Sequence, residues 1–480
     1  MPLPDQTPPG SHTRYERLAH DMAAAMREGL LRPGDRLPSV RETCRRRGVS
    51  PSTVFQAYGL LEARGLIEAR PRSGYFVRGP RRDTRALAAA VPAAGATVVA
   101  VTELAFDLIE SARNPDVVPL GSAFPAPHLF PFAALARNGA RAMRRLAPRE
   151  ITSALTTGDE RLRQQLRTRY ALHGVPLAAD ELVITNGAME ALSLCLQAVT
   201  RPGDVVAVES PTFYAALQAL ERLGLRAVEV ATDPRDGVDL EALEAVLARE
   251  RIAACWFMPT LQNPLGALMP AARKMQLVAL LARHGVPLIE DDVYGELHVD
   301  VQRPQPAKAF DREGLVLHCG SFSKCLAPGY RVGWAAPGRF AAAVRRLKMM
   351  SSLATSIPAQ AAIAEYLAQG AYDRHLRQLR AALQSAQERA RRHIERYFPR
   401  GTRITRPAGG YFLWLELPPS VDALALHRQA MHEGISTAPG VLFSADRRFV
   451  HHVRLNVGHP GDARIGPALR RLGELAHGKR

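Results

Sequence analysis

Six short apolar runs alternate with helical segments through the larger part of this 480-residue chain. The runs cover residues 181–185, 205–209, 226–230, 253–258, 286–290 and 315–319. Apolar runs of strand length that are separated by helices predict an α/β fold, with a mostly parallel sheet covered by helices. In such sheets, ligands bind beyond the carboxyl ends of the strands.

Residues with binding chemistry follow five of these runs. They are Gly187 and Ala188 after the first run, Phe213 after the second, Asn263 after the fourth, Asp291 after the fifth, and Ser321 to Lys324 after the sixth. Because parallel strands end at the same edge of a sheet, we expect these residues to share one site.

The segment after the sixth run places an amine beside hydroxyls, in the order Ser321-Phe322-Ser323-Lys324. The chain holds only five lysines (Lys274, Lys308, Lys324, Lys348 and Lys479) among 63 basic residues. Arginine stays protonated, whereas lysine can lose its proton and form a Schiff base with a carbonyl group. The segment therefore predicts a pyridoxal 5'-phosphate site with Lys324 as the catalytic residue that binds the cofactor.

Other residues at this edge suit the phosphate of that cofactor. A helix that opens at Gly187 and Ala188 offers free backbone N–H groups to an anion. Ser321, Ser323 and Arg331 supply hydroxyl and guanidinium donors for the same group. Together these residues predict a phosphate cup.

The remaining candidates suit the ring and a substrate. Asp291 is expected to face the protonated pyridine nitrogen, while Asn263 and Tyr294 hydrogen-bond the ring oxygen and Phe213 stacks on the ring. Arg454 is expected to bind a substrate carboxylate through two parallel hydrogen bonds. Taken singly, each has a plainer alternative: Asp291 as a cap, Phe213 as a core residue and Arg454 as a surface ion pair.

Composition narrows the class of protein. Five scattered cysteines without Cys-x-x-Cys spacing argue against a disulfide framework and a structural zinc site. The absence of an apolar signal core or a membrane-spanning stretch predicts a cytoplasmic protein with no membrane partner. A net charge of +17 indicates a polyanionic partner.

The length of the chain predicts more than one domain. Residues 80–110 lack a helical or strand period and are predicted to link a first domain, residues 11–79, to a second, residues 111–480. Residues 11–80 carry 13 basic and 7 acidic residues, so 13 − 7 gives +6 on the small first domain. The end of the second domain is expected to form a smaller C-terminal α+β lobe.

The first domain has the spacing of a winged helix-turn-helix. Leu18, Met22, Met26 and Leu30 lie at helical spacing, a second helix is predicted from about Ser39, and Ser50 is predicted to cap a third over residues 51–64. Residues 66–69 and 75–77 predict two strands. The hairpin between them carries Arg70, Arg72 and Ser73 and could lie along a DNA backbone.

The pattern Gly34-Asp35-Arg36-Leu37-Pro38-Ser39-Val40-Arg41, followed by Ser50-Pro51-Ser52-Thr53-Val54 and Ser73-Gly74-Tyr75-Phe76-Val77, resembles the GntR winged helix-turn-helix family. The resemblance implies DNA contacts by Arg41, Ser50, Ser52 and Thr53, with further contacts from the wing. Pro51 stands where the family often has a basic residue, which leaves the base preference open. The alternative is a winged helix used for protein contact.

The ordered motifs of the second domain resemble the aspartate aminotransferase-like, fold type I enzymes. They are Asn263-Pro264-Leu265-Gly266, Asp291-Asp292-Val293-Tyr294, Ser321-Phe322-Ser323-Lys324, Arg331-Val332-Gly333 and Arg454-Leu455-Asn456. With the first domain, the chain resembles the MocR subfamily of bacterial transcriptional regulators. That resemblance implies a homodimer, commonly head-to-tail, and a DNA operator of repeated or palindromic half-sites. Two departures are Ser153, where many aminotransferases have a Tyr, and Leu265 in place of a common Thr.

Three functions are compatible with these motifs. The leading hypothesis is a DNA-binding regulator that holds pyridoxal phosphate as an internal aldimine on Lys324 and senses pyridoxal phosphate or an amine or amino-acid effector. The second is an active aminotransferase that carries a DNA-binding domain. The third is a repressor whose large domain only dimerises.

Overall fold

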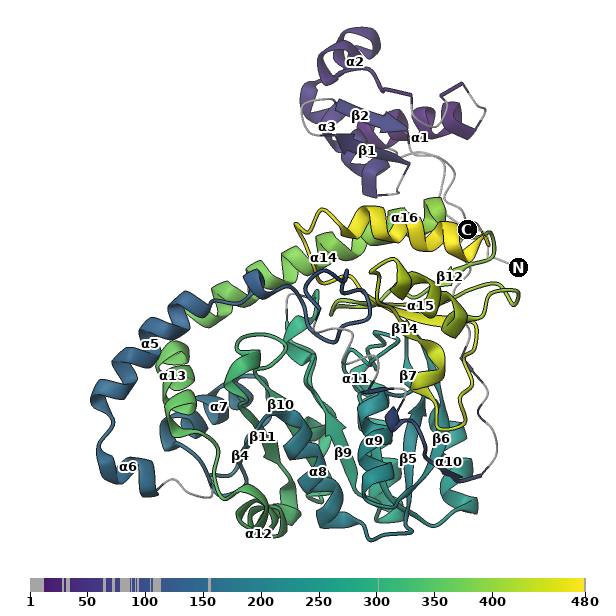
Figure 1. Cartoon of the computed structure of the whole chain (residues 1–480). Coiled ribbons are helices and arrows are strands. Elements are labelled where there is room, and N and C mark those ends of the chain that lie inside the picture. Colours follow the sequence, from purple (N-terminus) through teal and green to yellow (C-terminus); the bar gives the residue numbers. More distant parts are fainter. Residues whose placement is uncertain are drawn as a thin grey trace. The chain divides into compact units, whose positions relative to one another are not determined.

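The chain forms two compact units, residues Met1–Thr84 and Arg85–Arg480 (Figure 1). The computed structural model describes residues 13–27, 30–31, 35–63, 66–70, 74–77, 87, 89–90, 92, 95–103, 105–106, 114–153, 157–300 and 302–478. About half of the predicted linker, and Arg72 and Ser73 of the predicted wing, lie outside the described residues.

The small unit contains three helices and a hairpin. They are α1 (Arg14–Arg27), α2 (Val40–Arg47), α3 (Pro51–Ala63), β1 (Ile67–Arg70) and β2 (Gly74–Val77). The predicted cap of α3 is present, because Ser50 Oγ accepts from the Thr53 amide at 3.2 Å, and Ser39 Oγ caps α2 by accepting from the Glu42 amide at 3.2 Å. The prediction of a helix-turn-helix followed by two strands is confirmed.

The core of the small unit joins all of these elements. Apolar residues from α1, α3 and both strands pack together and are buried, among them Leu18, Val54, Leu61, Ile67 and Val77. The Tyr58 hydroxyl donates to the Pro38 carbonyl at 2.7 Å and lies 2.8 Å from the Thr43 hydroxyl. These contacts fix the start of α2 against α3, the geometry that a helix-turn-helix requires.

The large unit is built on a nine-stranded sheet of order β3-β6-β5-β8-β9-β10-β11-β4, with β7 paired to β6. The strands are β3 (Thr97–Val98), β4 (Val183–Thr185), β5 (Val205–Ser210), β6 (Arg226–Asp233), β7 (Gly237–Val238), β8 (Ile252–Phe257), β9 (Leu288–Asp291), β10 (Val316–Ser321) and β11 (Gly333–Ala336). The pairings from β6 through β10 are parallel. The mostly parallel sheet is therefore confirmed, although the antiparallel strand β11 between β10 and β4 was not predicted.

Helices surround this sheet, as Figure 1 shows. They are α5 (Phe132–Arg145), α6 (Pro148–Ser153), α7 (Glu160–Leu172), α8 (Ala188–Val199), α9 (Tyr214–Arg222), α10 (Leu240–Arg249), α11 (Ala271–His284), α12 (Ala341–Ser352) and α13 (Ile357–Ala368). All residues of β5, β9 and β10 are buried. Burial on both faces is expected for central parallel strands that are covered by helices.

A smaller lobe completes the large unit. The 27-residue helix α14 (Ala371–Tyr397) leads to a four-stranded sheet of order β12-β13-β15-β14, formed by β12 (Arg403–Ile404), β13 (Phe412–Glu416), β14 (Ala438–Pro439) and β15 (His452–Asn456). Helices α15 (Ala423–His432) and α16 (Ile465–Ala476) contribute to its apolar core. The predicted C-terminal lobe is therefore present.

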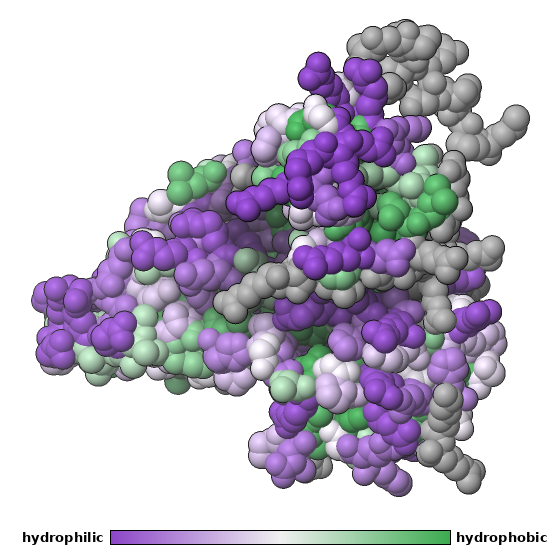
Figure 2. Space-filling view, turned by 90° about the horizontal axis from the view of Figure 1, so that it is seen from above, coloured by the Kyte–Doolittle hydropathy of each residue, from purple (hydrophilic) through white to green (hydrophobic). Residues whose placement is uncertain are grey.

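The surface in Figure 2 is mostly hydrophilic, with hydrophobic side chains in smaller patches. Among the described residues, no helix combines the length and the apolar composition that crossing a membrane requires.

Candidate functional site

A cavity of about 1160 Å³ lies at the carboxyl ends of the parallel strands. All of the residues predicted to hold the cofactor line it, except Gly187, which adjoins the lining residue Ala188, and Asn263, which accepts a hydrogen bond from Arg454. The lining set contains Ala188, Phe213, Asp291, Tyr294, Ser321, Ser323, Lys324 and Arg331.

Lys324 follows β10 and directs its amine into this cavity. Its Nζ donates to the Ala123 carbonyl at 2.8 Å and lies 3.7 Å from the centre of the Phe124 ring. Burial, together with the charges of Arg454 and Arg331, lowers the pKa of Lys324 to about 7 against the opposing effect of Asp291. A lysine with a pKa in this range is partly neutral near pH 7, so it can act as a nucleophile toward a carbonyl group.

Asp291 ends β9 and is 1% exposed. Its Oδ1 accepts from the Val293 amide at 3.4 Å, while Oδ2 has no hydrogen-bond partner among the described residues. Burial raises the pKa of Asp291 to about 7. A buried carboxylate oxygen without a donor is costly, and a protonated pyridine nitrogen would supply the donor and keep the carboxylate ionised.

The predicted phosphate cup comes together at the start of α8. Arg331 donates from its guanidinium to the Ser323 hydroxyl at 3.2 Å and to the Asn186 carbonyl at 3.4 Å. Gly187 has φ +81°, and a Cβ there would lie 2.5 Å from Arg331 Nη2. No side chain caps the helix. Free helix amides beside hydroxyls and a guanidinium fit a phosphate group.

Two further residues hold this cup and were not predicted. Glu190 accepts from the Asn186 amide at 2.6 Å, and the fully buried Lys348 donates to Glu190 at 2.7 Å. The scarcity of lysine, which singled out Lys324, applies equally to Lys348 and could have identified it.

Arg454 on β15 is 0% exposed, so the alternative of a surface ion pair is wrong. Its guanidinium donates to the Asn263 side-chain oxygen at 3.2 Å and to the carbonyls of Gly121 and Ser122 at 2.8 and 3.2 Å. It also lies 4.3 Å from the centre of the Phe412 ring. Backbone carbonyls therefore occupy Nη2 and Asn263 occupies Nη1, while Nε has no hydrogen-bond partner among the described residues.

The aromatic candidates flank the cavity. Phe213 caps α9, is half-buried and lies against Tyr214, with ring centres 4.9 Å apart. Tyr294 is buried and meets Tyr411 and Phe412 edge-on, with ring centres 5.8 and 5.7 Å away. Burial raises the pKa of Tyr294, which keeps its hydroxyl as a hydrogen-bond donor.

Two departures from the aminotransferase pattern can be located. Ser153 is the last residue of α6, and its side chain lies outside the described part. Leu265 is buried, and its amide donates to the Gln262 side-chain oxygen at 2.9 Å.

The candidate DNA contacts gather on α2 and α3 of the small unit. Arg41 is exposed and makes no hydrogen bond or ion pair with any described residue. The Ser50 hydroxyl lies 2.9 Å from that of Ser52 and 2.8 Å from that of Thr53. Arg70 belongs to β1, but its side chain is outside the described part of the chain.

Comparisons with known families match the two parts of the chain separately, and the boundary between Thr84 and Arg85 falls between the two matches. Residues 14–77 match the bacterial regulatory proteins of the gntR family, and residues 116–472 match the family of class I and II aminotransferases. Two curated relatives extend over nearly the full length. The HTH-type transcriptional regulator YdcR of Escherichia coli K12 is 46% identical over 96% of this chain and 98% of its own, and YjiR of the same organism is 38% identical over 97% and 99%.

Solved structures resemble the large unit. The multiple substrate aminotransferase of Thermococcus profundus matches with a TM-score of 0.72 and 27% identity, over 78% of this chain and 94% of its own. The α-aminoadipate aminotransferase LysN of Thermus thermophilus, complexed with N-(5'-phosphopyridoxyl)-L-leucine, matches with a TM-score of 0.70 and 29% identity, over 79% and 99%.

Proposed function

Because the chain belongs to the class I and II aminotransferase family and carries an N-terminal gntR-family regulatory domain, we propose that it is a pyridoxal-phosphate-dependent transcriptional regulator of the MocR type. The observation that carries the proposal is the pairing, in one chain, of a helix-turn-helix with a cavity that holds both Lys324 and Asp291, whose Oδ2 has no hydrogen-bond partner among the described residues. Full-length relatives named as transcriptional regulators support it. Residues 11–79 would bind DNA, and residues 111–480 would bind cofactor and effector.

When bound, the cofactor supplies an aldehyde for an amine and a ring that withdraws electrons. Residues of this chain would position it. Ser321, Ser323, Arg331 and the first turn of α8 would hold the phosphate, and Asp291 would keep a proton on the ring nitrogen. Asn263 and Tyr294 would hydrogen-bond the ring oxygen while Phe213 covers one face, and Lys324 would provide the covalent link.

We propose an amine or amino acid as the effector, because only such a compound competes with Lys324 for the aldehyde. A carboxylate on that compound would bind Arg454 after displacing the carbonyls of Gly121 and Ser122, which now accept from it. The same displacement would affect Ala123, the acceptor of the Lys324 amine. Effector binding would thus change the conformation of residues 121–124.

The regulatory output is DNA affinity. In a cytoplasmic homodimer, two winged helices would contact repeated or palindromic half-sites, with Arg41 on the DNA backbone and Ser52 and Thr53 near base edges. An effector changes operator affinity only as far as it binds one dimer arrangement better than the other.

The visible absorption spectrum tests the proposal first. The cofactor-loaded chain is titrated with a panel of amino acids and amines, and operator affinity is measured with each compound that shifts the spectrum. We expect at least one compound to move the absorption band and change DNA affinity together. If operator affinity never changes with any compound that reaches the cofactor, the sensing role is wrong.

Active transamination is the second candidate, because Lys324, Asp291 and Arg454 are all present and the similar solved structures include aminotransferases. The same titration separates the two functions. A regulator holds a shifted but stable spectrum, whereas a transaminase converts the cofactor to its amine form and an oxo acid reverses the change.

A further inference from the structure

The large unit contains a second cavity of about 1190 Å³, which shares no lining residue with the cofactor cavity. It lies between the end of α7, the first turn of α11, residues 296–300 and 302–305, and α14. We call it the α11 cavity. The cofactor chemistry described above uses none of its residues.

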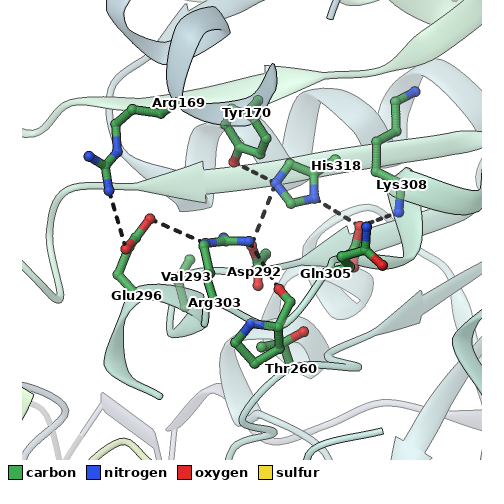
Figure 3. A network of polar contacts seen from close by, with 12 residues as sticks. Arg169, Tyr170, Thr260, Asp292, Val293, Glu296, Arg303, Gln305, Lys308 and His318 are labelled. Atoms are coloured by element: carbon green, nitrogen blue, oxygen red, sulfur yellow. Dashed lines mark hydrogen bonds and ion pairs between the residues drawn. The ribbon is translucent and has the colours of Figure 1, made fainter. Parts of the chain in front are cut away.

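Cationic side chains outnumber carboxylates on its lining. Three arginines converge on Glu296, with nitrogen–oxygen distances of 3.2 Å from Arg303, 3.3 Å from Arg380 and 3.6 Å from Arg169 (Figure 3 shows Arg169, Glu296 and Arg303). Arg377 is exposed and makes no hydrogen bond or ion pair with any described residue. The lining contains the cations Arg169, Lys274, Arg303, Arg377 and Arg380 and the carboxylates Glu296, Asp300 and Asp373.

Lys274 has the least favourable position of these cations. It is 1% exposed, and its Nζ donates to the Thr260 hydroxyl at 2.6 Å and to the Gln305 carbonyl at 2.8 Å. Within the described residues, no carboxylate lies within 4.0 Å of this ammonium. Its hydrogen-bond partners are neutral, and burial lowers the pKa of Lys274 to about 8 although the carboxylates of Glu290 and Asp292 oppose that change.

The start of α11 adds to the cost of burying this charge. Lys274 lies in the first turn, where the helix dipole is positive, and the turn contains no acidic residue. Pro270 precedes the helix and provides no side-chain cap. An anion at this end of the cavity would offset both the helix dipole and the Lys274 charge.

His298 is an independent indication of a missing group. It lines the cavity and is 1% exposed, yet neither ring nitrogen makes a well-formed hydrogen bond to a described residue. Burial, and then Arg380, lower its pKa to about 4 against smaller opposing effects of Glu296 and the Asp300 backbone. The neutral imidazole has one N–H to donate, and buried donors in folded proteins are almost always paired.

We propose that the α11 cavity binds a small anion through a phosphate or carboxylate group, with Lys274, His298, Arg377 and the free amides of α11 as its donors. This site is separate from the cofactor phosphate cup and does not depend on the function proposed above.

The segment after β9 runs between the two sites. Asp291, Val293 and Tyr294 line the cofactor cavity, while Glu296 and His298 line the α11 cavity. Asp292, next to Asp291, pairs with Arg303 and lies 3.7 Å from the buried His318, as Figure 3 shows. An anion in the α11 cavity would therefore bind within a few residues of the cofactor ligands.

The test is equilibrium dialysis of radiolabelled inorganic phosphate against the full-length, cofactor-loaded chain at constant ionic strength in chloride. Cofactor loading fills the phosphate cup, so phosphate that still binds must occupy another site. We expect about one phosphate per chain, and a Kd raised about tenfold in Lys274→Met and His298→Phe, the size expected for losing a charge-assisted bond or leaving a polar group unpaired. Citrate as competitor distinguishes a site that also accepts carboxylates from one restricted to phosphate, and both results support the proposal.

Matched variants keep the test decisive if a buried substitution prevents folding. Arg377→Ala removes an exposed cation from the lining and should raise the Kd severalfold. Arg374→Ala removes an exposed cation that lies on the same helix but outside the cavity, and it should leave the Kd for phosphate unchanged. Phosphate binding that Arg331→Ala abolishes but Arg377→Ala does not would assign the anion to the cofactor cup and overturn the proposal. So would a cofactor-loaded chain that binds no phosphate.

Discussion

The amine of Lys324 donates to the main-chain oxygen of Ala123 at 2.8 Å, although the two residues are 201 positions apart in the sequence. The neighbouring carbonyls of Gly121 and Ser122 accept from Arg454. One short segment therefore contacts both the residue proposed to bind the cofactor and the residue proposed to bind an effector carboxylate.

Replacing Lys324 with Ala should remove covalent cofactor binding while the fold is retained. The amine donates a hydrogen bond to the Ala123 carbonyl, and a lysine whose pKa is lowered by burial contributes little favourable charge interaction to folding. We expect the visible band of the lysine-linked cofactor to disappear and the melting temperature of the cofactor-free chain to change by only a few degrees. A chain that no longer folds would contradict the assignment of Lys324 as a functional rather than a structural residue.

The pKa of Lys324 predicts two pH effects. The rate of cofactor attachment should rise between about pH 6 and 8 and level off above, because the neutral amine is the nucleophile. Between the folded pKa of about 7 and the ordinary value of 10.5, the unfolded chain binds more protons at this residue than the folded chain does. The free energy of unfolding of the cofactor-free chain should therefore receive an increasing contribution from Lys324 as pH rises through that window. The Lys324→Met variant should lack this contribution. Stopped-flow absorbance and denaturant unfolding measure the two effects.

Asp291→Asn should weaken cofactor binding at least tenfold. The substitution keeps the size of the side chain but removes the charge that would stabilise a protonated ring nitrogen, and a charge-assisted hydrogen bond contributes about 1.5–3 kcal/mol. Glu209→Gln is the matched control, since Glu209 is also a buried carboxyl but does not line the cavity. Equal losses in both variants, measured by absorbance titration with the cofactor, would argue against the role of Asp291.

Gly187→Ala should lower both stability and cofactor affinity. Its φ of +81° disfavours a side chain, and the new Cβ would lie 2.5 Å from Arg331 Nη2. Gly370 has φ +68° with nothing within 4 Å, so Gly370→Ala should lose about 1 kcal/mol of stability from backbone strain alone and keep its cofactor affinity. Thermal unfolding and cofactor titration of both variants separate strain from the clash in the cup.

Arg41→Ala should weaken DNA binding and reduce its salt dependence without altering the cofactor spectrum. Arg41 is exposed on α2 and is expected to contact a phosphate. Arg17→Ala removes an exposed charge from α1 of the same unit and serves as the control. If the Kd for DNA fragments rises equally in both variants, Arg41 contributes to DNA binding only through the net charge of the domain.

Local patterns predicted most of the architecture. The apolar runs at 205–209 and 315–319 became β5 and β10 with ends within two residues, because buried parallel strands have a strong apolar signal. Strand β11, with the sequence Gly-Trp-Ala-Ala, gave no such signal and depends on its pairing with β10 and β4.

The proximity of the residues proposed to form the phosphate cup was predictable for a different reason. Ser323, Lys324 and Arg331 are close in sequence, so a motif identifies them together. The contacts of Ala123 with Lys324 and of Lys348 with Glu190 join segments 201 and 158 residues apart. Only the folded chain brings such pairs together, and no local pattern indicates them.

The groups that accept hydrogen bonds from Arg454 Nη2 are main-chain carbonyls, and a ligand carboxylate would have to compete with them. Substituting Gly121 or Ser122 changes a side chain but not its carbonyl oxygen. A ligand that binds Arg454 would therefore have to displace the same carbonyls in any such variant. Amines without a carboxylate would gain no binding energy from Arg454 and would leave the carbonyls of Gly121 and Ser122 bound to it. Discrimination among ligands would then depend on whether a ligand displaces these carbonyls from Arg454. The free-energy cost of that displacement would set the lowest ligand concentration to which the protein responds.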